Sequence, residues 1–221
     1  WEIPALAVIM ELHSRAVLKG MGKFELQVLY ARAMTRVWEK IGRLKVLPDF
    51  SIADFGTRRR HGFLWQDWCV QAMKEGLGAS FLGTSNCVIA MRREVEAIGT
   101  NAHELPMVYA ALARSDVELA EAPYRVLADW QEDYDGNLRV ILPDTYGTPE
   151  FLNHAPDWID RWTGVRIDSG DPALNAETVI RWWQSRGQDP KQKLIIFSDG
   201  LDVDTIEGLY GRFDGRVRVG F

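Results

Sequence analysis

The sequence predicts an α/β protein with a parallel sheet, which is either closed into a barrel or open and doubly wound. Two observations predict this. From residue 49 onward, short apolar runs recur that end in Gly, Ser, Thr or Asp. Amphipathic stretches with helical spacing separate these runs. A strand–helix alternation that is repeated about six times builds a parallel sheet through right-handed crossovers.

Residues 1–48 follow a different pattern. Apolar side chains recur at helical spacing between Ile3 and Leu44, with a break at Lys19-Gly20-Met21-Gly22. This pattern predicts a pair of helices. We therefore expect a helical segment over residues 1–48 that leads into an α/β domain over residues 49–221.

Strands and helices are expected to alternate along the second segment. Strands are expected at residues 50–56, 79–84, 97–100, 138–144, 164–168, 193–199 and 217–219. Helices are expected at residues 63–77, 87–95, 104–113, 150–161, 176–186 and 205–213. Asp204, followed three residues later by Glu207, fits a capping box at the start of the last helix. Residues 134–137 predict a tight turn.

The composition excludes several classes of protein. A hydrophobic fraction of 47% is too high for a disordered chain, and a formal charge of −5 at pH 7 argues against nucleic-acid binding. The apolar run from Ile3 to Met10 ends at Glu11, so we expect neither a signal peptide nor a membrane span. Cys69 and Cys87 lack the spacing of a disulfide scaffold or a zinc site, and we expect buried thiols in a cytoplasmic protein.

Polar residues follow the carboxyl ends of the expected strands. They lie at residues 54–58, 83–86, 99–104, 144–145, 168–171 and 198–202. Parallel α/β folds hold their active sites at this edge, so one face should carry the chemistry. Gly-Thr pairs at 83–84 and 99–100 leave backbone N–H groups able to approach a phosphate, although each pair alone is a weak signal.

His103 begins an expected helix directly after the second of these pairs. A phosphoryl group on its ring would lie over the positive end of the helix, and Glu104 or Asp144 could orient the other ring nitrogen. A zinc-protease pattern is excluded because His103-Glu104 is not followed by a second His at the required spacing. The other histidines, His13, His61 and His154, are expected at the surface or in packing positions.

Four carboxylates, Asp168, Asp171, Asp199 and Asp202, follow neighbouring strands. They would repel one another unless a cation or ribose hydroxyls bind between them. Mg²⁺ suits them because it takes oxygen ligands and commonly bridges to substrate phosphates. Asp171 precedes Pro172 and is expected to cap a helix, so Asp168 and Asp199 are the candidate metal ligands.

Two arginines are candidate anion-binding groups. Arg58 lies close after Phe55, so an aromatic ring can stack on a planar anion while the guanidinium pairs with it. Arg166 alternates with Val165 and Ile167 in an expected strand, where it needs an anion or carboxylate partner.

Taken in order, six motifs resemble those of the nicotinate phosphoribosyltransferases, within the type II phosphoribosyltransferase group. They extend over about two thirds of the chain. The motifs are Asp54-Phe55-Gly56-Thr57-Arg58-Arg59-Arg60, Phe81-Leu82-Gly83-Thr84-Ser85-Asn86, Gly99-Thr100-Asn101-Ala102-His103-Glu104, Leu142-Pro143-Asp144-Thr145-Tyr146, Val165-Arg166-Ile167-Asp168-Ser169-Gly170-Asp171-Pro172 and Phe197-Ser198-Asp199-Gly200-Leu201-Asp202.

The resemblance implies an irregular parallel α/β barrel and an active site shared across a homodimer. The implied reaction joins nicotinate to phosphoribosyl pyrophosphate, giving nicotinate mononucleotide and pyrophosphate, in NAD biosynthesis. The resemblance also implies Mg²⁺ as cofactor and ATP as a co-substrate whose hydrolysis is coupled through a phosphohistidine.

The resemblance also implies roles for particular residues. His103 resembles the histidine that ATP phosphorylates, with Glu104 and Asp144 in support. Asp168 and Asp199 resemble the catalytic carboxylates that act with magnesium.

Phe55 resembles the residue that stacks on the pyridine ring, and Arg58 lies beside it for the nicotinate carboxylate. Ser85 occupies a position at which the nicotinamide-using relatives carry an acid. The other expected substrate-binding residues are Thr84, Arg166 and Ser198.

Comparison of the chain with the family pattern leads us to expect that it is truncated at both ends. Residues 49–221 would then be an incomplete catalytic barrel. Three interpretations remain open: a nicotinate enzyme, a nicotinamide or quinolinate phosphoribosyltransferase on the same fold, and a non-catalytic barrel fragment that serves in binding or dimerisation.

Overall fold

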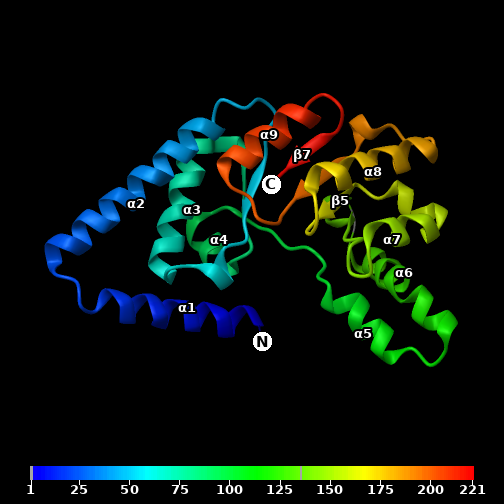
Figure 1. Ribbon diagram of the computed structural model, residues 1–221, viewed down its shortest axis with the longest axis horizontal. Helices are drawn as coiled ribbons and strands as arrows, with labels where there is room; N and C mark the ends of the chain where they lie inside the picture. The colour runs from blue at the N-terminus through cyan, green and yellow to red at the C-terminus, as the bar shows by residue number, and fades with distance from the viewer. Residues whose placement is uncertain (1, 135) are drawn as a thin grey trace. The chain divides into compact units, whose positions relative to one another are not determined.

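The computed structural model describes residues 2–134 and 136–221. The chain divides into two compact units, and the boundary between them lies between Ile98 and Gly99. Each unit is α/β, with parallel strands and helices between them (Figure 1). The predicted fold class, α/β with parallel strands, is therefore confirmed. Asp135, in the turn expected at 134–137, and Trp1 lie outside the described residues.

The first unit starts with two helices and continues as a small parallel sheet. The helices α1 (Glu2–Leu18) and α2 (Lys23–Leu44) confirm the predicted pair. The sheet has the order β1-β2-β3, from β1 (Ile52–Asp54), β2 (Phe81–Thr84) and β3 (Glu96–Ala97). Helix α3 (Phe63–Leu77) and helix α4 (Cys87–Arg93) make its crossovers, and η1 (Thr57–Arg59) and η2 (Gly78–Ser80) are 3-10 turns.

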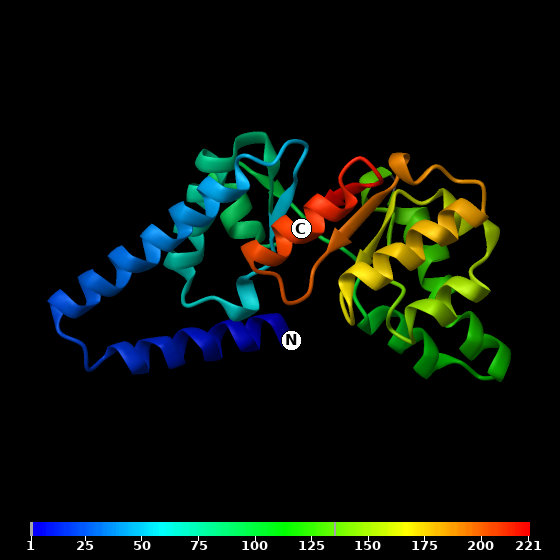
Figure 2. The same cartoon turned by 45° about the horizontal axis from the view of Figure 1, so that its top comes forward.

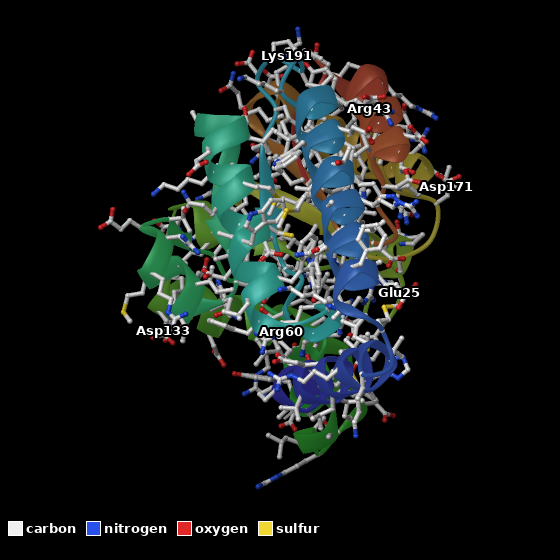
Figure 3. The ribbon with its side chains drawn as sticks, turned by 90° about the vertical axis from the view of Figure 1, so that its left-hand side faces the viewer. Glu25, Arg43, Arg60, Asp133, Asp171 and Lys191 are labelled. Atoms are coloured by element: carbon white, nitrogen blue, oxygen red, sulfur yellow. The ribbon has the colours of Figure 1, made fainter. Side chains whose placement is uncertain are left out.

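Helices α2 and α3 pack side by side (Figure 3, where Glu25 and Arg43 lie on α2). At Gly76 of α3, an added Cβ would lie 2.4 Å from Ile41 Cγ2 of α2. The absence of a side chain at Gly76 therefore lets the two helices meet.

The second unit holds a four-stranded parallel sheet in the order β4-β5-β6-β7. Its strands are β4 (Val140–Ile141), β5 (Gly164–Ile167), β6 (Leu194–Phe197) and β7 (Arg218–Gly220). Its helices are α5 (Glu104–Leu112), α6 (Asp116–Asp133), α7 (Thr148–His154), α8 (Pro172–Ser185) and α9 (Val203–Phe213). The 3-10 turns are η3 (Gly136–Leu138), η4 (Asp157–Arg161) and η5 (Pro190–Gln192).

The core of this unit lies between the sheet and its helices. Val165 and Ile195 pair across β5 and β6 and are fully buried, as are Trp183 of α8 and Phe213 of α9. Helices α5 and α6, green in Figures 1 and 2, form a helical hairpin. The strands are held in register by this core, so their carboxyl ends lie at one edge of the sheet.

Helix α6 was not predicted. Its sequence is strongly charged and carries Pro123 within the helix, which weakens the periodic signal. A start signal was nevertheless present. Ser115 accepts a hydrogen bond from the backbone N–H of Glu118 at 3.2 Å, and the Glu118 carboxylate accepts one from the N–H of Arg114. Serine followed three residues later by glutamate is a capping-box pattern.

Several predicted boundaries differ from the observed ones, and three of these differences are described below. The third strand covers Glu96–Ala97 instead of residues 97–100, because it pairs with the last two residues of β2 and that strand ends there. The last helix is capped by Asp202, which accepts from the N–H of Thr205 at 2.8 Å, and not by Asp204. The helix expected at 150–161 is divided into α7 and η4.

The cysteines also differ in part from expectation. Both are free; Cys69 is half-buried, but Cys87 is exposed at the start of α4. The prediction of two buried thiols is therefore wrong for Cys87, because it starts a helix at the surface. The helices of residues 2–134 and 136–221 lack the length and the apolar character that a membrane span requires.

Candidate active site

Two polar clusters lie at the carboxyl ends of the strands, one in each unit. The His103 cluster, in the second unit, consists of Thr100, His103, Asp144, Arg166, Asp168, Ser169 and Ser198. The Asp54 cluster, in the first unit, consists of Asp54, Thr57, Gln66, Thr84 and Asn86.

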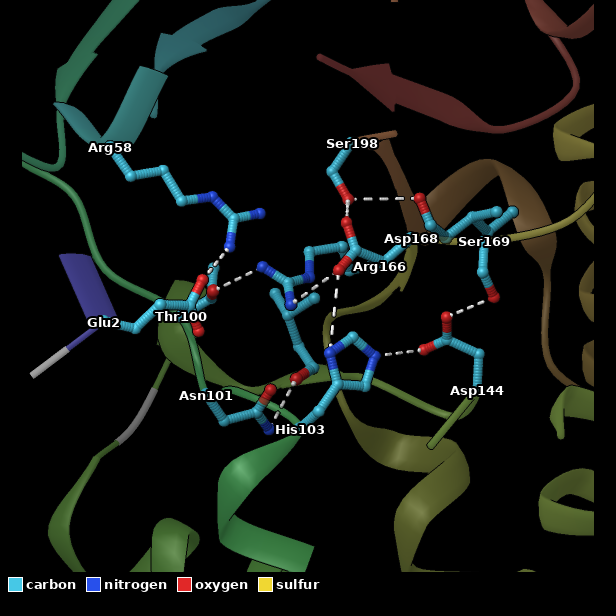
Figure 4. Close-up of polar contacts among 12 residues, drawn as sticks. Glu2, Arg58, Thr100, Asn101, His103, Asp144, Arg166, Asp168, Ser169 and Ser198 are labelled. Carbon is cyan, nitrogen blue, oxygen red and sulfur yellow. Dashed lines mark hydrogen bonds and ion pairs between the residues drawn. The ribbon is translucent and has the colours of Figure 1, made fainter. Parts of the chain in front are cut away.

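His103 lies between two carboxylates (Figure 4). Its Nε2 is 3.0 Å from Oδ1 of Asp144, and its Nδ1 is 3.8 Å from Oδ2 of Asp168. Only the contact of Nε2 with Asp144 has the length of a hydrogen bond, and a carboxylate only accepts hydrogen bonds, so Nε2 is the donor. In the neutral ring, Nδ1 then keeps a lone pair. The nitrogen with the lone pair is therefore the one that faces Asp168.

Asp144 is held by a second donor. Its Oδ2 accepts a hydrogen bond of 2.5 Å from the Ser169 hydroxyl, and its side chain is only 8% exposed. Asp144 follows β4 and Ser169 follows β5, which is the neighbouring strand. The Asp144 carboxylate is thus fixed at both oxygens and orients the imidazole.

Asp168, Arg166 and Ser198 form a second connected set. Ser198 donates its hydroxyl to Asp168 Oδ1 at 2.6 Å, and an Arg166 Nη atom lies 3.4 Å from Asp168 Oδ2. The other Nη atom of Arg166 donates to the Thr100 hydroxyl at 2.9 Å. A guanidinium, a carboxylate and two hydroxyls therefore lie next to the imidazole, which suits a ligand that carries both phosphates and hydroxyls.

The remaining predicted acids of the second unit lie outside this set of contacts. Glu104 is exposed in the first turn of α5, and within the described part of the chain the ring contacts Asp144 and Asp168, not Glu104. Asp199 follows Ser198 and is exposed. Asp171 caps α8, as predicted, by accepting from the N–H of Leu174 at 2.9 Å.

In the first unit, the Asp54 carboxylate organises the strand ends. It accepts hydrogen bonds from the N–H of Gly56 at 2.9 Å, from Gln66 Nε2 at 2.8 Å and from the Thr84 hydroxyl at 2.7 Å. Thr84, predicted to bind substrate, is fully buried and also accepts from the N–H of Asn86. Its observed contacts hold the loop after β2.

The three residues predicted to surround a pyridine ring differ in exposure. Phe55 is 46% exposed, which leaves its ring available for stacking. Arg58 donates to Glu2 at 2.7 Å in a pair that is about half exposed on both sides. Ser85 is half-buried, and its backbone N–H donates to the Asp54 carbonyl oxygen at 2.8 Å.

Gly83, of the first Gly-Thr pair, has a role in packing. Its φ is +150°, and an added Cβ would lie 2.1 Å from the carbonyl oxygen of Glu96 on β3. Only glycine therefore allows β2 and β3 to approach this closely. This contact explains Gly83 without a phosphate.

A magnesium ion would fit the His103 cluster only together with the phosphate groups of a ligand. Among residues 2–134 and 136–221, no three His, Cys, Asp or Glu side chains lie close enough together to hold a metal ion. Both oxygens of Asp168 already face donors, namely Ser198 and Arg166. Since Mg²⁺ commonly takes one or two carboxylates together with waters and substrate phosphates, the acids present suit that role and not an all-protein cage.

Four positioning residues were not predicted: Thr57 and Gln66 of the Asp54 cluster, and Thr100 and Ser169 of the His103 cluster. Thr57, Thr100 and Ser169 lie inside the six motifs, and Ser169 directly follows the candidate acid Asp168, which was the available signal for it. Gln66 gave none, because it lies on α3 and reaches Asp54 only through the packing of that helix on the sheet.

Comparison with known proteins adds to this geometry. The family model described as the nicotinate phosphoribosyltransferase (NAPRTase) family matches residues 50–221. This chain belongs to the nicotinate phosphoribosyltransferase family. The match includes the strand ends that carry both clusters.

Solved structures of similar proteins agree with this assignment. A nicotinate phosphoribosyltransferase from Porphyromonas gingivalis superposes with a TM-score of 0.89 at 29% identity, and one from Vibrio cholerae with 0.82 at 33%. A Saccharomyces cerevisiae protein that provisionally carries the same name gives 0.81 at 27%. All of this chain is covered in each case, and it spans 54%, 51% and 53% of those chains, about half their length.

Proposed function

We propose that the protein joins nicotinate to phosphoribosyl pyrophosphate, giving nicotinate mononucleotide and pyrophosphate, as a step of NAD biosynthesis. Membership of the family supports this proposal. The observation that carries it in this chain is the His103 cluster, in which an imidazole, two carboxylates, a guanidinium and hydroxyls meet on adjacent strand ends.

In the proposed reaction, the pyridine nitrogen of nicotinate attacks the anomeric carbon of the ribose. The bond from that carbon to the pyrophosphate oxygen breaks, and pyrophosphate leaves with the bonding electrons. Positive charge develops on the ribose and negative charge on the leaving group. The Asp168 carboxylate is suited to stabilise the positive charge, and the Arg166 guanidinium the negative charge. Ser198 holds Asp168 in place, and Thr100 holds Arg166.

Magnesium is proposed as the cofactor, held by Asp168 and Asp199 together with the phosphates of the substrate. Bound there, it would neutralise the charge of the departing pyrophosphate. The residues of this chain then orient the phosphates through the Arg166 guanidinium.

Coupling to ATP is proposed to run through His103. Nδ1 attacks the γ-phosphorus of ATP, the bond to the β–γ bridging oxygen breaks, and ADP leaves. Asp144 stabilises the positive charge that develops on the ring through its contact with Nε2. Hydrolysis of this phosphohistidine then releases inorganic phosphate. Glu104, at the start of α5, is not required by this scheme.

The pyridine is proposed to bind at the strand ends of the first unit. Phe55 stacks on the ring and Arg58 pairs with the carboxylate of nicotinate, which requires Arg58 to leave Glu2. Ser85 tolerates that carboxylate, whereas an acid at this position would repel it. Thr84 acts by holding the loop that carries Ser85.

Four further features belong to the proposal. The strands are proposed to form one irregular barrel, and the helical segment 1–48 is proposed to lead into a catalytic domain at 49–221. The protein is proposed to act in the cytoplasm as a homodimer with shared active sites. In the part of the chain that the structure describes, every strand pair is parallel, which supports the barrel. An experimental structure of the protein with phosphoribosyl pyrophosphate would test the barrel and the dimer together.

The function is tested by comparing three pyridines. With phosphoribosyl pyrophosphate and Mg²⁺, nicotinate should be converted to its mononucleotide faster than nicotinamide or quinolinate. A preference for nicotinamide or quinolinate would assign the chain to another specificity and contradict the role given to Ser85. Lack of turnover of all three would favour a binding or dimerisation module.

A further inference from the structure

The second unit contains a pocket that the proposed reaction does not use. We call it the α5–α7 pocket. It has a volume of about 640 Å³ and lies between α5, α6, α7 and the chain that follows β4. Small-molecule sites commonly have volumes of about 300–1,000 Å³.

The wall of the pocket is mainly apolar. The buried side chains Leu127 and Leu142 line it, and so do Ala120, Pro123 and Phe151. The hydroxyl groups of Tyr124 and Tyr146, which also line the pocket, are already bonded to backbone carbonyl oxygens of Phe151 and Pro106. A ligand with an apolar body therefore suits these walls better than a sugar or a phosphate.

The charge at the pocket disfavours anions. Glu121 and Glu150 line it and are exposed, and His154 Nδ1 pairs with Glu150 at 3.2 Å. Burial, and then the negative charge of Glu150, raise the pKa of Tyr124. An anionic ligand would face the same carboxylates, whereas an uncharged ligand would not be repelled.

The pocket shares its backbone with the His103 cluster. Asn101 and Ala102, which line it, directly precede His103, and Thr145 and Tyr146 directly follow Asp144. His103 and Asp144 are 3.0 Å apart at their contacting atoms. A ligand that binds better to one arrangement of these two segments would shift the contact between the two side chains.

We propose that the α5–α7 pocket binds a small uncharged molecule with an aromatic or aliphatic body, and that its occupancy alters the contact between His103 and Asp144. This proposal does not depend on the proposed function, because the binding of the molecule and the contact between His103 and Asp144 can both be observed without turnover.

Two matched fluorescent probes test the binding. N-Phenyl-1-naphthylamine is uncharged, and 8-anilinonaphthalene-1-sulfonate is the same molecule with a sulfonate. The first should bind at one saturable site at least about tenfold more tightly than the second, since only the sulfonate meets Glu121 and Glu150. Equal affinities would overturn the proposal.

Two matched variants locate the probe. Ala120→Trp places an indole in the pocket and should weaken binding of the uncharged probe at least about tenfold. Ala111→Trp makes the same change at an exposed site on α5 that does not line the pocket, and it should bind like the parent protein. If Ala120→Trp binds the probe as tightly as the parent, the pocket is not the site.

The coupling is read from the imidazole of His103 by NMR, with His103→Gln used to identify the signal. Saturation with the uncharged probe should shift this signal in the parent protein and not in Ala120→Trp. An unmoved signal at saturation would overturn the coupling.

The parent protein and Ala120→Trp should also sediment alike. If Ala120→Trp dissociates a dimer, the pocket is a subunit interface and the proposal is wrong.

Discussion

At the scale of single residues, the position of His103 is set by contacts between distant parts of the chain. The sequence identified His103 and Asp144 as candidates but left Glu104 as an equal partner. The structure joins the imidazole to Asp144, 41 residues away, and not to its neighbour in sequence. The reason is geometric: Glu104 is exposed in the first turn of α5, while β4 delivers Asp144 to the ring.

A pair of amide substitutions tests this assignment. Asp144→Asn keeps the shape of the side chain but removes the charge that stabilises the imidazolium, so formation of the acid-labile phosphate from ATP should fall by about a hundredfold. Glu104→Gln is the matched control and should change the rate by less than about twofold.

The measurement is the rate of transfer of labelled phosphate from γ-labelled ATP to the protein. His103→Asn should take up no label. Label on that variant would contradict the role of His103, whereas equal losses in the two amide variants would contradict the distinction between Asp144 and Glu104.

The two cysteines predict a difference in reactivity. Burial raises the pKa of the Cys69 thiol to about 11 from an ordinary 9.0, so at pH 8 it forms about a hundredfold less of the reactive thiolate than an ordinary thiol. Cys87 is exposed. Labelling with a chromogenic disulfide should therefore occur in a fast and a slow phase, and the slow rate should rise about tenfold per pH unit toward pH 11.

Single serine variants assign the two phases. Cys87→Ser should remove the fast phase and Cys69→Ser the slow one. Two equal rates in the unmodified protein would show that burial does not lower the reactivity of Cys69.

At the scale of elements, close backbone approach fixes the positions of the strands. An added Cβ at Gly164 of β5 would lie 2.2 Å from the carbonyl oxygen of Leu194 on β6. The clash is with backbone that is held in the sheet, so it cannot be relieved by turning a side chain. The register of β5 and β6, which brings Asp168 beside Ser198, depends on this glycine.

Gly164→Ala should lower the free energy of unfolding by about 3 kcal/mol, because the strands must separate to admit the methyl group. Gly211→Ala is the control: it lies in α9 with no atom within 4 Å of the added Cβ, and it should raise the free energy of unfolding by about 0.5–1 kcal/mol. Urea unfolding of both variants gives the comparison, and a Gly164→Ala protein as stable as its parent would contradict the packing argument.

The cap of α6 gives a second prediction at this scale. Ser115→Ala removes the acceptor for the N–H of Glu118 and should lower the free energy of unfolding by about 1 kcal/mol. Ser115→Thr keeps the hydroxyl oxygen and should lose less than half of that amount. Urea unfolding again gives the measurement, and equal losses in the two variants would show that the cap contributes nothing.

At the scale of the whole molecule, the acidic balance of the chain acquires a local meaning. Part of the formal charge of −5 comes from Asp168 and Asp199 at the edge of the second sheet. A ligand that binds only the folded protein raises its stability by an amount set by the ligand's concentration relative to its dissociation constant. The proposed substrate and metal should therefore stabilise the protein together.

With Mg²⁺ present, phosphoribosyl pyrophosphate at a hundred times its dissociation constant should add about 2.7 kcal/mol to the free energy of unfolding. Removing the metal with EDTA should abolish most of this gain, as should Asp168→Asn. Thermal unfolding with and without EDTA measures it. The same gain in EDTA would show that the phosphates bind without a metal and would contradict the cofactor proposal.

Much of the architecture could be predicted because its signals are local. All seven predicted strands overlap observed ones, and the helix expected at residues 63–77 matches α3 (Phe63–Leu77). Helical spacing, apolar runs and capping residues involve neighbours in the chain, so they can be recognised without the fold. Helix α6 was missed although its cap was visible, because charge and an internal proline obscured its periodicity.

Local patterns along the chain were sufficient to predict the strand–helix alternation, the parallel strands, and the edge at which the polar residues gather. They could not predict that Asp144 orients His103, that Ser169 holds Asp144, or that Gln66 supports Asp54, which became known from the folded chain. These contacts join residues 41, 25 and 12 positions apart. They depend on strand register and helix packing, which bring together side chains that no local pattern relates.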